Sequence, residues 1–476
     1  MRAKKYMLSA LLGGLAITAV TAGALAGDGE QGEYVAPEEI THASAYSIAN
    51  VQYNRDTSDI NRIVYAYDKH HNLLTEYRDF ADDTENYEMA YTNTYDQAGR
   101  LTHVRAPKGR VDCSYSYDAA SGHVIEEDAY GGTSEYDADG KLLTQTEEYS
   151  DGSGSRKVYS YNEKGDVSLV MDYGKNFEND PYELSYKDEY TYAYNEHNDV
   201  VSETMRRYTY HKDSKTWELL HTNASEFEYT YENGEKTSTC VYRIQDGKQI
   251  ADKKYIFDSN GNANEVYVGK TYEDRIEWEK VVSSVTYVKT SELDKISFSD
   301  VPVSAWYTPY VQYASANGLM NGTGNAKFAP DLSLSRAMFA QILYNRAGRP
   351  AVSGAQTFTD VPKDQWYYDA VQWASAQGIV NGMGDGTFAP NADVTREQMA
   401  VMLYHAQGSP ESDVSLSKFE DTASVSNWAV NAVKWAVQEK VINGSSENGK
   451  LYINPTGSAT RAESATMMTN YARTFS

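Results

Sequence analysis

Cysteine and positive charge are scarce in this chain. Cys113 and Cys240 are the two cysteines among 476 residues, too few for a disulfide framework. Two alternatives remain for them, a single pair in an exported protein or two reduced, partly buried thiols. Lys and Arg number 43 against 68 Asp and Glu, so the formal net charge is −25. We therefore expect no nucleic-acid partner, and any site for an anion must be built locally.

Long apolar runs are also rare. One begins at Met7 and continues to about Ala24, after three cations and before small residues, and it predicts a secretory signal at 1–26. An uncleaved membrane anchor is the alternative. Residues 27–44 lack periodicity and are expected to be a flexible leader. No later run is long enough to span a membrane, so we expect no membrane partner after signal cleavage.

Familiar catalytic motifs are missing. The sequence contains no Gly-x-Ser-x-Gly elbow, no His-Glu-x-x-His pair and no Walker loop. We therefore predict no catalytic residue, no metal site and no cofactor. A glycosidase-like pair of carboxylates could still exist, because the separation of such a pair is spatial and cannot be counted along a chain.

Tyrosine marks the first of two regions. Of the 41 tyrosines, 31 lie between residues 27 and 296. Segments such as "YDQAGRLTHV" at 95, "YDADGKLLTQ" at 136 and "YNEKGDVSLV" at 161 recur there. Alternating Tyr, Thr and Val with Asp or Asn before Gly predicts antiparallel hairpins, so residues 45–295 are expected to form an all-β meander. The segments loosely resemble the YD repeats of Rhs-type surface proteins. The tyrosines either pack the sheet faces or form a carbohydrate- or protein-binding face.

A stricter repeat occupies the last 180 residues. "FSDVPVSAWY" at 298, "FTDVPKDQWY" at 358 and "FEDTASVSNWA" at 419 each begin a unit of about 60 residues. Each unit continues into an amphipathic helix, a loop and a second helix with a Ser or Thr N-cap. We set three modules at 296–350, 351–410 and 411–476. A single helical hairpin cannot bury its apolar face, so the three are expected to pack together.

These modules resemble the S-layer homology (SLH) module. The resemblance is carried by Phe-x-Asp, the Trp eight or nine residues on, Asn-Gly, Phe-x-Pro and Thr-Arg-Ala-Glu, in that order. It implies an all-α bundle of helical hairpins with pseudo-three-fold symmetry and ligand grooves between modules. It also implies non-covalent attachment to a secondary cell-wall polysaccharide, commonly one carrying pyruvate ketals.

The candidate polysaccharide site begins with an arginine at the first position of each second helix. A cation is unfavourable there for the helix alone, but first-turn N–H groups and a guanidinium together would make a receptor for a carboxylate. The alternative is a structural salt bridge to a neighbouring module. These arginines are Arg336, Arg396 and Arg461.

Three further sets of residues complete the candidate site. Tryptophans could stack on a sugar ring or pack in the core: Trp306, Trp366 and Trp428. Aspartates could accept from sugar hydroxyls, cap the first helix or brace a loop: Asp300, Asp360 and Asp421. Glycines are expected to serve turn geometry first and close approach of the ligand second: Gly322, Gly382 and Gly444.

The three helix starts are not equal. Thr460 with Glu463, and Thr395 with Gln398, have the spacing of a capping box, whereas Met338 cannot supply the reciprocal bond. The third module also has a longer loop. We therefore predict that the groove using Arg396 contributes most to affinity.

The sequence as a whole predicts an exported protein of the cell wall and cell surface, anchored through its SLH modules and displaying a β-repeat segment with a structural or recognition role. Two alternatives remain. The first is a wall-tethered polysaccharide hydrolase with its carboxylates among the tyrosine-rich strands. The second is an Rhs-like toxin carrier, disfavoured because the anchor stands at the C-terminus, where a toxin tip would be.

Overall fold

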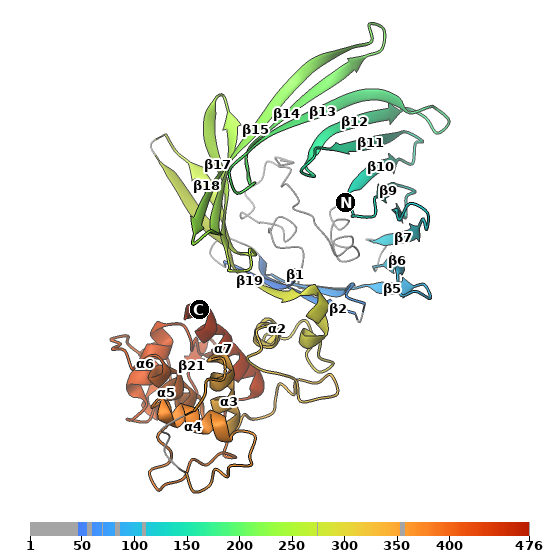
Figure 1. Ribbon diagram of the computed structural model, residues 1–476. Helices are drawn as coiled ribbons and strands as arrows, with labels where there is room; N and C mark the ends of the chain where they lie inside the picture. Colours follow the sequence, from blue (N-terminus) through green and yellow to red (C-terminus); the bar gives the residue numbers. More distant parts are fainter. Residues whose placement is uncertain are drawn as a thin grey trace. The chain divides into compact units, whose positions relative to one another are not determined.

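The computed structural model describes residues 46–54, 60–68, 70–80, 86–106, 111–273, 275–352 and 358–475. The predicted signal at 1–26 and leader at 27–44 lie outside these residues. The chain divides into two compact units, with the boundary between Leu293 and Asp294 (Figure 1). Among the described residues, no helix is long and apolar enough to cross a membrane.

The N-terminal unit is built from strands. Each is paired in an antiparallel sense with the strand before or after it. The strands are β1 (Tyr46–Tyr53), β2 (Ile60–Tyr67), β3 (Leu73–Phe80), β4 (Tyr87–Ala90), β5 (Thr92–Tyr95), β6 (Leu101–Arg105), β7 (Asp112–Tyr117), β8 (Val124–Asp128), β9 (Thr133–Tyr136), β10 (Leu142–Glu148), β11 (Gly154–Tyr161), β12 (Val167–Lys175), β13 (Glu183–Tyr194), β14 (Val200–His211), β15 (Thr216–Glu232), β16 (Glu235–Gln245), β17 (Lys248–Phe257), β18 (Ala263–Thr271) and β19 (Ile276–Lys289).

The sheet closes on itself. Strand β1 pairs with β2 on one side and with β19 on the other, where Val51 lies opposite Val285. Strands β4 and β5 are separated by Tyr91 alone and pair with β3 and β6 respectively, so the meander continues through them. Figure 1 shows the strands following one another around this curved sheet. The expected antiparallel hairpins are confirmed, but no local sequence pattern indicates the closure.

The repeated Tyr-Asp segments form the hairpin turns. The Asp96 carboxylate accepts hydrogen bonds from the Ala98 and Arg100 N–H groups, and Gly99 has φ +80°. Tyrosine hydroxyls then connect one turn to the next, since Tyr194 donates to Asp166 at 2.6 Å and Tyr231 donates to Asp199. Other tyrosines donate to strand carbonyls: Tyr67, Tyr117, Tyr161, Tyr192, Tyr229 and Tyr287. These bonds support the packing interpretation of the tyrosines.

Both cysteines of the N-terminal unit are free thiols. Cys113 is buried and Cys240 is half-buried. Burial raises the pKa of the Cys240 thiol above its ordinary value. Of the two alternatives expected from the sequence, the structure therefore agrees with two reduced, partly buried thiols.

The C-terminal unit is built from short helices and long loops. After a 3₁₀ segment, η4 (Thr290–Ile296), at the boundary come the following elements: α2 (Thr308–Ala316), α3 (Arg336–Arg346), α4 (Tyr368–Ala376), α5 (Arg396–Ala406), η5 (Thr422–Ser424), α6 (Val430–Gln438), β20 (Ser445–Glu447), β21 (Lys450–Tyr452) and α7 (Arg461–Thr474).

The expected all-α bundle of helical hairpins is wrong in two respects. The unit contains a two-stranded sheet, β20 paired with β21, and isolated β-bridges between loops. Its closest helix pairs also join different modules, because α3 packs on α4, α5 on α6 and α7 on α2. Each module has a nine-residue first helix and long loops, so it buries little apolar surface by folding on itself. Each second helix therefore packs on the next module instead.

A ring of backbone hydrogen bonds ties the three modules together. The Leu334 N–H donates to the Ala459 carbonyl (2.9 Å), the Ala459 N–H to the Val394 carbonyl (2.9 Å), and the Val394 N–H to the Leu334 carbonyl (2.8 Å). Each of these residues is fully buried and stands two residues before an arginine that begins a helix. The ring fixes the three helix starts around one centre.

Candidate functional site

Three equivalent sites lie between modules, and each combines an arginine of one module with a loop and an aspartate of the next. The last module completes the cycle with the first. We name each site by its arginine: the Arg336 site has Asp360 and the loop at Phe388–Ala389, the Arg396 site has Asp421 and Ile453–Asn454, and the Arg461 site has Asp300 and Phe328–Ala329.

Each aspartate holds a strained turn. The Asp360 carboxylate accepts hydrogen bonds from the N–H groups of Phe388 (2.8 Å) and Ala389 (2.7 Å). Ala389 has φ +57°, which costs a residue other than glycine about 1 kcal/mol or more. Asp300 and Asp421 make the same pair of bonds. The predicted aspartates therefore brace a loop, which is one of the roles the sequence left open.

The pKa of Asp300 shows the balance of forces at this turn. Desolvation by burial acts to raise the pKa of its carboxyl, but it is outweighed by the N–H bonds from Phe328 and Ala329 together with the Asp300 N–H and the charge of Lys327. The pKa of Asp300 is therefore lowered, and the carboxylate is charged under ordinary conditions.

Each arginine holds the same turn from its carbonyl side. The Arg336 Nε donates to the Phe388 carbonyl (2.9 Å), and its Cζ lies 4.8 Å from the centre of the Phe388 ring. Arg461 repeats both contacts with Phe328, at 2.8 and 4.6 Å. Both arginines are 7% exposed. Burial lowers the pKa of the Arg336 guanidinium, and the Asp360 carboxylate acts in the opposite direction.

The helix starts do not form the expected anion receptor. The Arg336 N–H donates to the Ala392 carbonyl (2.9 Å), and the Ala337 N–H donates to the Pro390 carbonyl (3.0 Å). The Met338 N–H donates to the Ser335 hydroxyl (3.2 Å). The first-turn N–H groups of α5 and α7 are satisfied in the same way. That part of the prediction is wrong, and the guanidinium remains the group that can meet an anion.

The guanidiniums differ in their remaining partners. Arg396 NH1 lies 3.2 Å from the Glu463 Oε1. Arg461 NH2 donates to the Asn321 carbonyl (2.7 Å). In the described part of the chain, the Phe388 carbonyl is the one hydrogen-bond acceptor of the Arg336 guanidinium. The Arg336 site therefore has the most hydrogen-bonding capacity left for a ligand.

The predicted tryptophans are exposed. Trp306 is 54% exposed, and Trp366 and Trp428 are each 59% exposed. Trp366 meets Tyr367 edge-on, with ring centres 5.2 Å apart. Such exposure excludes core packing for these three side chains, in contrast to Trp435, which is 1% exposed. Tryptophan is enriched at interfaces, because its ring is apolar and its N–H is a polar donor.

The predicted glycines are required by packing. A Cβ at Gly382 would lie 2.6 Å from both the Phe358 ring and the Thr387 carbonyl oxygen, and Gly382 has φ +72°. Gly322 and Gly444 meet the corresponding Phe ring in the same way. Turn geometry and the close Phe ring account for these three glycines.

Sequence reasoning missed one buried carboxylate beside the Arg396 site. Glu397 is 3% exposed and accepts hydrogen bonds from the Ser426 N–H (2.9 Å) and hydroxyl (2.8 Å), two residues before Trp428. The other two modules have Ala337 and Ala462 at the matching position. That difference in an otherwise regular repeat was the available signal.

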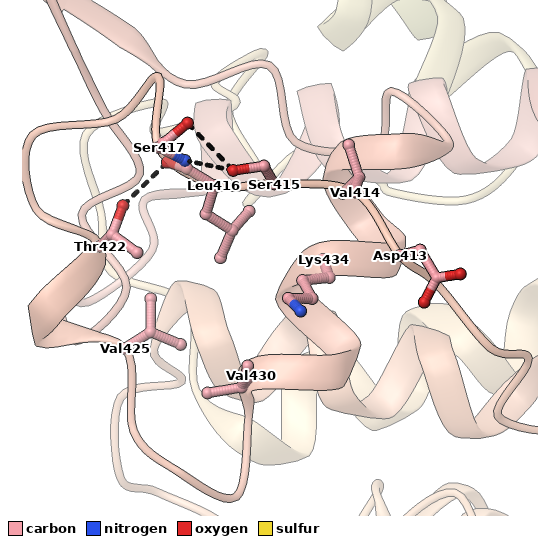
Figure 2. Close-up of a pocket in the computed structure, with 9 residues that line it drawn as sticks. All are labelled: Asp413, Val414, Ser415, Leu416, Ser417, Thr422, Val425, Val430 and Lys434. Atoms are coloured by element: carbon pink, nitrogen blue, oxygen red, sulfur yellow. Dashed lines mark hydrogen bonds between the residues drawn. The ribbon is translucent and has the colours of Figure 1, made fainter.

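A cavity of about 450 Å³ in the third module lies apart from the predicted residues (Figure 2). Its lining combines the segment 413–417 with Thr422, Val425, Val430 and Lys434. Local hydrogen bonds within that loop join Ser417 to Ser415 and Thr422 to Leu416 (Figure 2). None of the twelve predicted site residues lines it.

Comparison with known proteins identifies the modules. Residues 297–340, 357–400 and 418–465 match the S-layer homology domain family. The chain therefore carries three S-layer homology domains, as the sequence resemblance predicted. These domains, together with the relatives below, make it a cell-wall-anchored surface protein.

Its relatives share this region and differ elsewhere. The chain is 34% identical over 179 residues to an endoglucanase of Bacillus sp. (strain KSM-635), covering 37% of this chain and 18% of the relative. It is 36% identical over 163 residues to the surface-layer 125 kDa protein of Lysinibacillus sphaericus, covering 34% of this chain and 14% of the relative. It is 24% identical over 181 residues to the S-layer protein sap of Bacillus anthracis, covering 38% of this chain and 22% of the relative. The chain thus spans less than a quarter of the length of each.

Those matches lie in the S-layer homology region. A solved structure, TcdB2-TccC3 without its hypervariable C-terminal region, aligns over 47% of this chain and 13% of its own at 15% identity, with a TM-score of 0.22. A similarity at that level carries no argument, so the YD-repeat resemblance stays a prediction.

Proposed function

We propose that the three sites hold the protein on a secondary cell-wall polysaccharide that carries pyruvate ketals. The observation that supports this most strongly is that each site has a buried guanidinium, and that an exposed tryptophan follows the aspartate of that site by six or seven residues. Asp360, which acts on Arg336, and Trp366 lie in one loop six residues apart. A ketal presents one carboxylate on a sugar ring. The guanidinium matches the carboxylate, and the indole face matches the ring.

The charge of the buried arginine favours an anionic ligand. A guanidinium taken out of water is stable only when its charge and its N–H groups are compensated. At the Arg336 site the protein supplies one carbonyl and the field of Asp360. A bound carboxylate would complete this compensation. The unit carries three such sites. Once one site has bound the polymer, the effective concentration of polymer at the other two is high, so retention would be much stronger than binding at one site.

The tryptophans offer the cleanest test. Replacing Trp306, Trp366 and Trp428 by alanine should not change the melting temperature, because these side chains are exposed. The triple replacement should weaken retention on purified wall material by roughly tenfold or more, the value of a well-placed aromatic contact. Tyr130→Ala, at a 79% exposed ring in the N-terminal unit, is the matched control. Full retention by the triple variant would contradict the proposal.

The N-terminal unit is proposed as a displayed structural or recognition segment. Its tyrosine hydroxyls are engaged in bonds between turns and strands, as for Tyr194 and Tyr231, which favours a structural role. If the triple tryptophan variant were still retained on a cell-wall or host glycan, the N-terminal unit would be assigned a recognition role in place of a structural one.

One observation favours a second candidate, the wall-tethered hydrolase. Glu203 on β14 lies opposite Tyr192 of β13, and burial raises the pKa of its carboxyl to about 6. A raised carboxyl pKa is what a general acid needs near neutral pH. Incubating the protein with wall polysaccharides tests this candidate. Released sugars that disappear in Glu203→Gln would favour a hydrolase, and the absence of products from the wild type would remove it.

A further inference from the structure

The three sites have the same backbone hydrogen bonds but differ in charge at the third residue of the helix that begins with the arginine. The third residue of each arginine-bearing helix is Met338, Gln398 or Glu463. Because the modules pack in a cycle, Glu463 of the third module reaches Arg396 of the second. By the same relation Gln398 belongs to the Arg336 site and Met338 to the Arg461 site. The Arg396 site thus has an acidic residue where the other two have neutral ones.

The Glu463 carboxylate accepts hydrogen bonds from two groups. Its Oε2 accepts from the Thr460 N–H (2.9 Å), which completes the capping box of α7. Its Oε1 lies 3.2 Å from Arg396 NH1. The two side chains are 28% and 10% exposed, so solvent screens this ion pair less than a pair on the surface. Glu463 therefore occupies a terminal nitrogen of Arg396 and compensates its charge.

A second carboxylate distinguishes this helix in sequence. Glu397, the neighbour of Arg396 in the chain, is 3% exposed and bonded to Ser426. The Arg336 and Arg461 sites have alanine at that position. The exposed Asp393, which pairs with Ser335 in an isolated bridge near Arg336, is in contact with water and is screened. An anion that approaches Arg396 thus meets the half-buried charge of Glu463, which the other two sites lack.

We propose that Glu463 closes the Arg396 site to anionic saccharides, so that an acidic wall polymer is held at the Arg336 and Arg461 sites. This inference rests on the proposed function and names which sites carry it. A unit charge about 6 Å from a bound carboxylate, at an effective dielectric of about 20, weakens binding by roughly tenfold to a hundredfold. The inference reverses the ranking expected from the capping boxes, which counted Arg396 as the strongest site.

Two reciprocal substitutions in the full-length protein test it. Glu463→Gln removes the charge and keeps the cap, because Gln398 already supports a capping box in the second module. Gln398→Glu places the same charge at the Arg336 site. The probe is purified wall material, used with its ketal groups and after their removal by mild acid. Glu411→Gln, which removes an exposed charge elsewhere in the third module, is the control.

The expected results have opposite signs. On ketal-bearing wall material the Kd of Glu463→Gln should fall on the order of tenfold, that of Gln398→Glu should rise by a similar factor, and Glu411→Gln should match the wild type. If Glu463→Gln lowers the melting temperature, Gln398→Glu decides the question, because it leaves α7 unchanged.

The two proposals fail in different ways. Ketal-dependent binding by the wild type, with both variants within twofold of it, would overturn the role of Glu463 and leave the proposed function standing. Equal binding of the wild type to wall material with and without ketals would overturn both.

Discussion

Replacing Asp360 by alanine should destabilise the C-terminal unit strongly, although the residue lies at the edge of the core. Its carboxylate is the acceptor for the N–H groups of Phe388 and Ala389, at 2.8 and 2.7 Å. Alanine leaves both donors without that acceptor while Ala389 keeps its strained φ of +57°. It also removes the negative charge that acts on the buried Arg336 guanidinium.

The magnitude follows from these contacts. A hydrogen bond to a charged group contributes about 1.5–3 kcal/mol, so the loss of two gives about 3–5 kcal/mol once some rehydration of the turn is allowed. For a unit of this size, each kcal/mol lowers the melting temperature by about 2–4 °C. We therefore expect the melting temperature of Asp360→Ala to fall by roughly 10 °C.

Tryptophan fluorescence is a suitable assay, because five of the seven tryptophans lie after residue 296. Asp364→Ala is the matched control, since Asp364 is exposed, lies in the same loop and should change stability by less than about 0.5 kcal/mol. Coincident melting curves for Asp360→Ala and Asp364→Ala would refute the argument that the carboxylate holds the turn.

Two further predictions concern the same turns. Gly382→Ala should cost about 1–3 kcal/mol more than Gly386→Ala, because both have positive φ but only the Cβ at Gly382 would clash, at 2.6 Å from the Phe358 ring. Equal melting temperatures for the two variants would rule out the clash. The lowered pKa of Asp300 predicts a stability contribution that is complete above the unfolded pKa of about 3.9 and is lost as the pH falls through the folded pKa. As the pH is lowered below about 4, unfolding scans should therefore show a larger loss of stability for the wild type than for Asp300→Asn, and parallel losses would contradict the assignment.

Local chemistry could be predicted from the sequence. The capping boxes at Thr395 and Thr460 are present, and α3 lacks one, because caps depend on residues three positions apart. Gly378 follows α4 with φ +70°, as expected for a helix end. In the third module Lys440 occupies the position of Gly318 and Gly378, and it adopts φ +57° itself. Surrounding contacts there outweigh the preference of the residue.

Contacts between distant segments could not be predicted. The carbonyls that accept from the first N–H groups of α3 belong to Pro390 and Ala392, which lie in another module. No residue near Arg336 in the sequence indicates these two contacts. The closure of the sheet joins Val51 to Val285 in the same way. Such pairings depend on how whole segments pack, and a local pattern of polar and apolar residues does not encode them.

The most direct test of the account compares two samples of wall material, one with its pyruvate ketals intact and one treated with mild acid to remove them. The account predicts that the full-length protein is retained on the intact sample and released from the treated one, and that adding the Trp306, Trp366 and Trp428 substitutions reduces retention on the intact sample to the level of the treated one. Undiminished retention on the treated sample would contradict the claim that buried arginines and exposed tryptophans hold an acidic saccharide.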